Sequence, residues 1–420
     1  MPRLYLPNKL KRLSDKVESA ESVTSGHPDK VADQISDGVL DAMYEECSNP
    51  NSEYFGQDPR VAAETLVSSK DLIVLAGEIT PLLPDSFYQD VAKKVIADIG
   101  YNSKDIGLDY RDVKILVDYK RQSNDIAQGV DSSFGDKEQG AGDQGMMTGY
   151  AIDETPTLMP LPIYLAHNLA EMLEVLRRSG KVEELRPDGK SQVNVDYNCG
   201  NPWVRKLTLA AQHEPGVTLE DLYFILMPYI MDNLGNYFTE DTEVCINGTG
   251  VFEKGGPDGD TGLTGRKIVV DQYGSRAPVG GGAFSGKDPS KVDRSGAYMA
   301  RHIAKNIVAA GLTHECFVEI GYTIGVAEPT GLIVQLYGLN GLAKGLSPEK
   351  LELAVRNEFP LKPAELIDYF DLKKPIYRDT ATYGHMGREP VEKSGNNGCN
   401  YTTFPWEKTN RVEDLQKYLP

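Results

Sequence analysis

The stretch GGGAFSGKDPSKVDRS, residues 280–295, constrains what this chain can build more than any other part of it. Three consecutive glycines leave the backbone bare, and Lys287 and Lys291 stand four residues apart. Asp288 and Pro289 are N-cap and first-turn signals, and the apolar periodicity after them predicts a helix to about residue 310. Lys291 would then lie in the first turn, where the helix dipole disfavours a cation unless an anion is bound. The stretch therefore predicts a polyphosphate site.

Residues 281–287 also fit the P-loop pattern G-x-x-x-x-G-K. That motif continues with a metal-binding Ser or Thr, whereas this chain has Asp288, and Pro289 moves the helix start past the lysine. We therefore reject a P-loop. A tight turn that only caps a helix explains the glycines and Asp288 but not the lysines, so it ranks below phosphate binding.

The overall charge argues against nucleic acid or an anionic membrane as a partner, because 44 basic and 62 acidic residues leave a net charge of −18. The five cysteines are scattered without C-x-x-C spacing, which favours a reducing compartment and offers no zinc site. Residues 1–16 lack the apolar core of a signal peptide. We expect a cytoplasmic enzyme of two or three domains.

The segment ESVTSGHPDK opens the first predicted helix, which begins near Pro28 and buries an apolar residue every fourth position. His27 and Asp29 would project from its N-terminus, where phosphate or metal can approach. Asp33, Asp37 and Asp41 continue an acidic row along the helix, which we interpret as a solvated face rather than a metal site.

Two strands are predicted at 61–67 and 72–80, each with one glutamate, Glu64 and Glu78, in apolar sequence. Buried carboxylates need a cation or hydrogen-bond donors, which makes both glutamates ligand or metal candidates. Alternatively they point to solvent on a half-exposed strand, and the register of the hairpin decides. After a strand at 113–119, we expect a mobile lid from Arg121 to about Lys137 and an anchored turn GAGDQG.

The middle of the chain predicts interleaved helices and strands with hairpins among them, which favours mixed α+β layers over a doubly wound sheet. We expect helices at 160–179 and 219–233 and strands at 191–197, 204–212 and 243–247. The segment RPDGK is interpreted as a turn that presents Lys190 at the mouth of a strand.

A second glycine-rich block spans residues 248–271 and contains Asp260. Arg266 and Lys267 lead into a predicted strand, IVVD, where neighbouring side chains would point to opposite faces. The C-terminal third predicts strands at 316–324 and 332–337, helices at 348–357 and 363–370, and an inserted loop at 389–403.

Four motifs in this order, SGHPDK, GAGDQG, GDTGLTGRKI and GGGAFSGKDPSKVDRS, resemble the S-adenosylmethionine synthetase (methionine adenosyltransferase) family from about residue 21 to 410. The resemblance implies three similar α+β domains, with mixed sheets and helices on one face, related by a pseudo-threefold. The implied domains are 17–125, 139–254 and 256–409, with a mobile gating loop at 121–137. It also implies dimers with active sites at the subunit interface, often paired into tetramers.

The family's reaction joins ATP and L-methionine: sulfur attacks C5′ and expels triphosphate, which is hydrolysed to phosphate and diphosphate. The resemblance implies two Mg²⁺ ions on Asp29 and Asp293 and one K⁺ on Glu64. It gives catalytic roles to His27, Lys190, Arg266 and Lys287. The further positions that it implies for ATP are Asp188, Phe252, Asp260, Lys267, Ala283 and Lys291, and those for methionine are Glu78, Gln122, Asp143, Asp260 and Lys291.

The chain departs from the family pattern at Val279, where many relatives have histidine, and in extra segments at 48–58 and 389–403. None of these departures touches the motifs. Two other hypotheses remain: a non-catalytic nucleotide-binding subunit, which degraded catalytic positions would have favoured, and an ATP-dependent kinase, which would release ADP.

Overall fold

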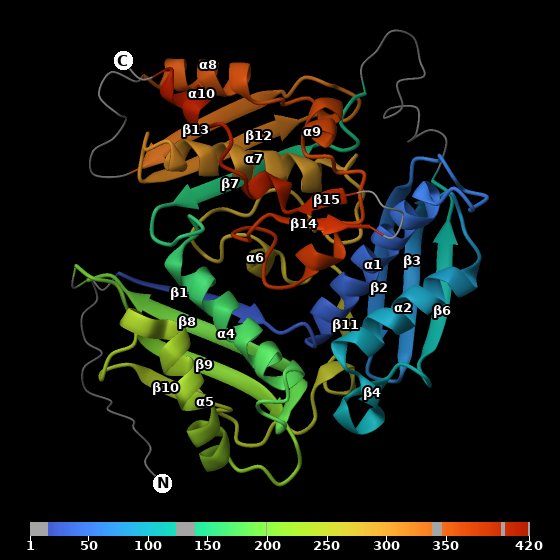
Figure 1. Cartoon of the computed structure of the whole chain (residues 1–420), viewed down its shortest axis with the longest axis vertical. Coiled ribbons are helices and arrows are strands. Elements are labelled where there is room, and N and C mark those ends of the chain that lie inside the picture. Colours follow the sequence, from blue (N-terminus) through green and yellow to red (C-terminus); the bar gives the residue numbers. More distant parts are fainter. Residues whose placement is uncertain (1–15, 123–138, 199, 338–346, 396–399, 419–420) are drawn as a thin grey trace.

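The structure is a computed structural model that describes residues 16–122, 139–198, 200–337, 347–395 and 400–418 (Figure 1). Most of the gating loop predicted at 121–137 lies outside these residues. The described chain contains three larger sheets, each with helices packed on it. No helix in the described ranges is both long and apolar enough to cross a membrane.

The first unit has the order helix, two antiparallel strands, helix and parallel strand. Its elements are α1 (Pro28–Ser48), β2 (Arg60–Ser68), β3 (Leu72–Thr80), α2 (Asp85–Ile99) and β6 (Lys114–Lys120). A short hairpin, β4 (Asn102–Ser103) and β5 (Leu108–Asp109), precedes β6. The predicted apolar stripe of α1, Val31, Ile35, Val39 and Met43, is fully buried, and the inward residues of β2 alternate as expected for a strand covered on one face.

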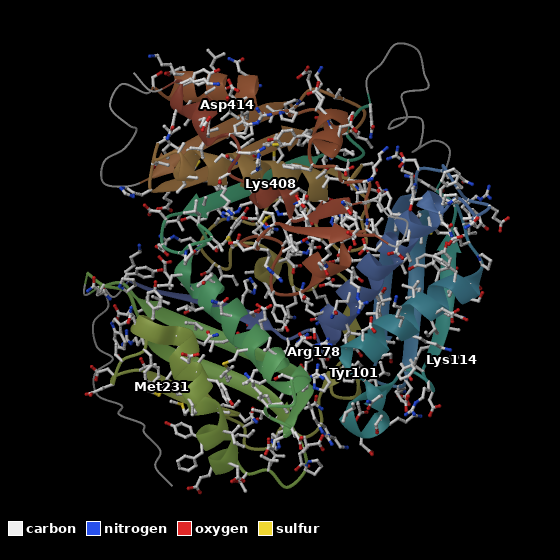
Figure 2. All side chains as sticks on the ribbon, viewed as in Figure 1. Tyr101, Lys114, Arg178, Met231, Lys408 and Asp414 are labelled. Atoms are coloured by element: carbon white, nitrogen blue, oxygen red, sulfur yellow. The ribbon has the colours of Figure 1, made fainter. Side chains whose placement is uncertain are left out.

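The second unit repeats this order. Its elements are α4 (Leu161–Arg178), β8 (Leu185–Asp196), β9 (Trp203–His213), α5 (Leu219–Leu234) and β10 (Glu243–Ile246), with β9 and β10 parallel. The outer side of α5 keeps apolar side chains in solvent, among them Met231, labelled in Figure 2, which is 49% exposed.

The third unit begins in the same way, with α7 (Val292–Ala309), β12 (Glu315–Tyr322), β13 (Gly331–Tyr337) and α8 (Pro348–Glu358). The chain then forms α9 (Pro363–Tyr369), a hairpin of β14 (Val391–Ser394) and β15 (Asn400–Thr403), and α10 (Val412–Gln416).

Each sheet is completed by a strand that precedes the helix of another unit. Strand β1 (Val17–Val23) precedes α1 but joins β8, β7 (Gly145–Ile152) precedes α4 but joins β12, and β11 (Gly262–Leu263) precedes α7 but joins β2. The first unit thus completes the second sheet, the second completes the third, and the third completes the first. This cyclic exchange confirms the predicted α+β class with three similar, threefold-related units.

Several local predictions were wrong. Residues 268–271 form the short helix α6 (Ile268–Asp271), not a strand. The segment RPDGK belongs to β8, whose pairing with β9 shifts register between Leu185 and Gly189, so no turn precedes the strand. Residues 389–403 contain the β14–β15 hairpin rather than a loop alone.

The start of α7 also differs from the prediction. The helix begins at Val292, with Lys291 at the N-cap position and not in the first turn. Asp288 does not cap α7; its carboxylate accepts hydrogen bonds from the Ser290 and Val61 amides at 2.9 and 2.6 Å. The reason is tertiary, since Asp288 ties this loop to β2, far away in the sequence.

Candidate active site

His27 is the N-cap residue of α1, in extended conformation (φ −61°, ψ 135°), and its Nδ1 accepts the Asp29 amide at 3.2 Å. The turn before it is held from two sides. The hydroxyl of Tyr101, labelled between the first and second units in Figure 2, donates to the Gly26 carbonyl at 2.5 Å. A Cβ on Gly26 would lie 2.4 Å from the Pro187 oxygen, so only glycine fits. The imidazole is therefore buried and fixed in place.

Burial is the main cause that lowers the pKa of His27 to about 3, and the positive charges of Lys190 and Lys267 add to the shift. The ring is thus neutral at pH 7. Because Nδ1 accepts a hydrogen bond, the proton of the neutral ring sits on Nε2, which is left as a donor.

Asp29 gathers cations beside His27. Its carboxylate contacts Lys267 Nζ at 2.5 Å and Arg266 Nη1 at 3.7 Å, and it accepts the Leu263 amide at 3.1 Å. Burial raises the pKa of Asp29, but the Lys267 and Leu263 hydrogen bonds outweigh it, so the net shift is downward. Since residues 268–271 are helical, the expectation that Arg266 and Lys267 diverge was wrong, and both reach one carboxylate.

Lys287 and Asp293 form a second ion pair of 2.5 Å. The Gly282 amide donates to Asp293 at 2.9 Å, and the backbone of Lys287 forms a bridge to Ala62 of β2. Lys291 lies apart from this pair in its contacts, with its ammonium 2.5 Å from Asp288.

The hairpin register settles the orientation of Glu64 and Glu78. Glu78 pairs with Ala62, two residues before Glu64, so both glutamates point to the sheet face opposite α1. Glu64 is exposed, and Glu78, 3.3 Å from Lys120, is about two-fifths exposed, in line with the solvent-facing alternative. Burial of part of its surface nevertheless raises the pKa of Glu64, against the charge of Lys287.

Asp188 adds a carboxylate near Lys190, whose charge also acts on His27. Its Oδ2 accepts the Gly256 amide at 2.8 Å, while its buried Oδ1 has no hydrogen-bond partner among the described atoms. Burial raises the pKa of Asp188 to about 6, although the Gly256 hydrogen bond and the charge of Lys190 oppose the shift. Asp260 donates its amide to the Gly256 carbonyl at 3.2 Å, so both aspartates belong to one loop contact.

The remaining predicted residues fall into two groups. The Phe252 amide donates to His213 Nε2. Ala283 packs so tightly on Gly265 that a Cβ added to Gly265 would lie 2.5 Å from the Ala283 Cβ. Ala283 thus joins the two glycine-rich blocks. Gln122 and Asp143 lie on either side of residues 123–138, which are outside the described chain.

The acidic row on α1 was interpreted wrongly. Asp33 and Asp37 are fully buried, and Asp41 is partly buried. Asp33 accepts the Gly265 amide, Asp37 the Gly286 amide, and Asp41 the Tyr377 and Arg378 amides, each at 2.8 Å. The partners of Asp33 and Asp37 lie more than two hundred residues away, so local sequence gave no signal for these contacts.

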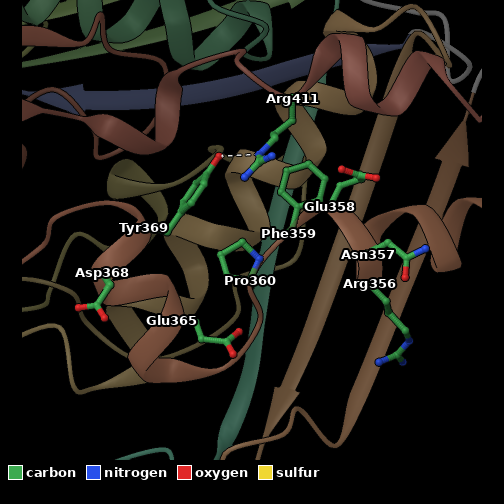
Figure 3. Close-up of a pocket in the computed structure, with 9 residues that line it drawn as sticks. All are labelled: Arg356, Asn357, Glu358, Phe359, Pro360, Glu365, Asp368, Tyr369 and Arg411. Atoms are coloured by element: carbon green, nitrogen blue, oxygen red, sulfur yellow. Dashed lines mark hydrogen bonds between the residues drawn. The ribbon is translucent and has the colours of Figure 1, made fainter.

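A hollow of about 720 Å³ lies elsewhere, between the ends of α8 and α9 and Arg411 (Figure 3). Arg411 donates to the Tyr369 hydroxyl at 3.0 Å there. None of the predicted site residues lines it, so we do not assign the chemistry to this hollow.

A neutral buried histidine beside an aspartate, an arginine and several lysines is an arrangement whose donors and positive charges suit a highly charged anion such as a phosphate chain. Comparison with protein families is more specific. The models for the N-terminal, central and C-terminal domains of S-adenosylmethionine synthetase match residues 15–124, 138–252 and 254–407. The S-adenosylmethionine synthase of Desulfosudis oleivorans (strain DSM 6200 / JCM 39069 / Hxd3) is 48% identical over 406 residues, which cover 95% of this chain and 97% of that protein. The chain belongs to the S-adenosylmethionine synthetase family.

Proposed function

We propose that this chain forms S-adenosylmethionine from ATP and L-methionine, by attack of the methionine sulfur on C5′ of ATP with release of triphosphate, which is then hydrolysed to phosphate and diphosphate. One observation carries this proposal: the Asp29 carboxylate holds the side chains of Lys267 and Arg266 directly beside the neutral His27. Family membership supplies the reaction.

A thioether is neutral and nucleophilic, so the reaction needs no general base. Its barrier lies in aligning sulfur, C5′ and O5′ and in stabilising the departing polyanion. We assign His27 to O5′, where its Nε2 proton can be donated as negative charge develops. A neutral donor suits this role because its hydrogen bond strengthens as the charge develops on O5′.

Lys190, Arg266, Lys267 and Lys287 are assigned to the triphosphate. In the described chain Lys267 and Lys287 each pair with a carboxylate, Asp29 and Asp293. Phosphate oxygens are acceptors for the same ammonium protons, so a bound triphosphate can take over these hydrogen bonds.

Asp29 and Asp293 are also our candidates for holding two Mg²⁺ ions. No group of three or more His, Cys, Asp or Glu residues in the described ranges could hold a metal ion. Two single carboxylates, those of Asp29 and Asp293, nevertheless fit magnesium, which takes one or two carboxylates and completes its shell with water and phosphate oxygens. When bound, the ions would neutralise charge on the phosphates. We assign one K⁺ to Glu64.

The substrate-binding assignments follow the family pattern. For the nucleoside part of ATP we propose Asp188, Phe252, Asp260 and Ala283, and for methionine Glu78, Gln122, Asp143, Asp260 and Lys291. We place the domains at 17–125, 139–254 and 256–409, with the gate at 121–137, and the enzyme in the cytoplasm. We also propose that two copies complete each active site and that dimers pair. In support, the face of the first sheet that carries Glu64 and Glu78 lies open beside the exposed Leu116.

Incubation with ATP, methionine, Mg²⁺ and K⁺ tests this function, and we expect S-adenosylmethionine, phosphate and diphosphate. Chromatography of the adenine-containing products separates the alternatives, because a kinase would yield ADP. A folded protein that binds ATP yet forms no product would instead support the non-catalytic subunit. Omitting either cation in turn tests the metal assignments.

A further inference from the structure

Helix α1 carries aspartates at every fourth position, 29, 33, 37 and 41, and each accepts backbone amides from residues between 263 and 378. In two of these contacts, the residue whose amide is bound directly precedes a cationic residue assigned to the triphosphate. Asp33 binds the amide of Gly265, next to Arg266, and Asp37 binds the amide of Gly286, next to Lys287.

The contact through Asp37 is reinforced by Arg294. The guanidinium binds both carboxylate oxygens of Asp37, at 2.6 and 2.9 Å, and donates to the Lys287 carbonyl at 3.0 Å. Its remaining protons go to the Tyr298 and Thr380 hydroxyls at 3.0 and 2.9 Å, so all five donors are used. Both groups are fully buried.

The backbone of Gly286 and Lys287 is thereby held at three consecutive peptide groups. The Gly286 amide donates to Asp37, the Ala63 amide donates to the Gly286 carbonyl at 2.9 Å, and Arg294 donates to the Lys287 carbonyl. The backbone from which the Lys287 side chain starts has no freedom to shift without breaking a buried hydrogen bond.

The contact through Asp33 is built in a similar way. Lys30 Nζ lies 3.0 Å from Asp33 and also contacts Asp271 of α6, so the carboxylate is neutralised where it meets Gly265. Gly265 has φ +80° and packs on Ala283, which couples this loop to the other glycine-rich block.

We propose that Asp33 and Asp37 are positioning residues that set the two cation-bearing loops in register for the triphosphate, Asp33 for Arg266 and Asp37, with Arg294, for Lys287. Neither carboxylate touches substrate; each acts through the backbone of the next cation. This inference rests on the proposed function for the identity of the anion.

Asp41 provides a matched control. It lies on the same helix in the same row and accepts two backbone amides, but these belong to Tyr377 and Arg378, at the start of the 3-10 helix Arg378–Ala381, which carries no residue assigned to the site. The Tyr377 ring lies 4.3 Å from the Arg294 guanidinium, so the control is matched most closely to Asp33. Asp41→Asn should perturb stability in the same way as Asp33→Asn without moving a cation.

The test measures kcat and KM of Asp33→Asn, Asp37→Asn and Asp41→Asn, per mole of natively folded protein, and the affinity of each for inorganic tripolyphosphate. Misplacing a catalytic group by about 1 Å can lower rate by roughly 100-fold, so we expect kcat losses of about that size in Asp33→Asn and Asp37→Asn, and a change below about twofold in Asp41→Asn. Tripolyphosphate should bind about tenfold more weakly only to the first two, as when one charge-assisted hydrogen bond is impaired.

Equal losses in all three variants, or full turnover in Asp33→Asn, would overturn the proposal, since a purely structural role predicts no difference between the sites. If Asp37→Asn does not fold because Arg294 is left unpaired, the double variant Asp37→Asn with Arg294→Gln takes its place. Inactivity of the unaltered chain would count against the proposed function alone, because the tripolyphosphate measurement still decides whether Asp33 and Asp37 position the cations.

Discussion

Replacing His27 by asparagine separates its catalytic role from its structural one. Asparagine is a good N-cap residue and can accept the Asp29 amide as Nδ1 does, but it cannot place a donor where Nε2 stands. Alanine removes both functions. Both variants lose the ring, and because asparagine keeps more side-chain volume than alanine at this buried position, the difference between them reports the cap together with that volume.

The expected magnitudes follow from these contacts. Loss of one donor to a developing oxyanion lowers kcat by roughly 10²–10³-fold, or about 3–4 kcal/mol, and both variants should lose this. Loss of the cap removes about 1 kcal/mol from the stability of α1, and only His27→Ala should lose that. Binding of ATP should survive in both.

Initial rates of S-adenosylmethionine formation at saturating substrates, together with denaturant unfolding, measure both quantities. Because the pKa of His27 is lowered to about 3, no ionisation of this ring should enter the rate profile between pH 6 and 8. Unchanged turnover in His27→Asn would refute the assignment of His27 to the leaving group.

Three further predictions concern the loops and the core. Lys287→Ala should lower the rate of triphosphate formation by about 100-fold while thermal stability stays nearly unchanged, because Lys287 is at the surface of the site; a collapse of the ligand-free melting temperature would contradict this. Gly286→Ala should destabilise and inactivate the enzyme, since φ is +83° and the new Cβ would lie 2.0 Å from the Ala63 oxygen. Gly56 has a similar φ of +79° but open space around it, so Gly56→Ala should lower the free energy of unfolding only by the roughly 1–2 kcal/mol that a non-glycine residue costs in left-handed backbone. Equal effects of the two substitutions would refute the steric argument. Burial lowers the pKa of His302 to about 4, so between pH 7 and pH 5 the unfolded chain takes up a proton that the native state does not, and this residue lowers the free energy of unfolding by about 2 kcal/mol on acidification. Unfolding experiments at the two pH values should show that His302→Gln reduces the pH dependence by that amount. An unchanged dependence would exclude the pKa shift.

Regular periodicity made much of the fold predictable. The four-residue apolar repeat of α1 and the alternation in β2 were sufficient to place both elements, because each buries one face against a neighbour that any compact chain would supply. The N-cap position of His27 was also predictable from the proline that follows it.

What failed depended on partners distant in sequence. Asp33 and Asp37 looked like a solvated row because the amides of Gly265 and Gly286, more than two hundred residues away, are not visible in local sequence. The β-rich composition of IVVD predicts a strand, yet the segment forms a single helical turn whose Asp271 contacts Lys30 of α1. Strand exchange among the three units is likewise a tertiary choice that no local propensity encodes.

A single-turnover experiment tests the central claim, which is that the cations on Asp29 (Lys267 and Arg266) and the cation on Asp293 (Lys287) serve the departure of one intact triphosphate. The experiment combines excess enzyme with methionine and with ATP labelled in the adenine ring and the γ-phosphate. We predict that tripolyphosphate and S-adenosylmethionine form together and in equal amounts before any phosphate appears. Labelled ADP or AMP, or phosphate released ahead of S-adenosylmethionine, would contradict it.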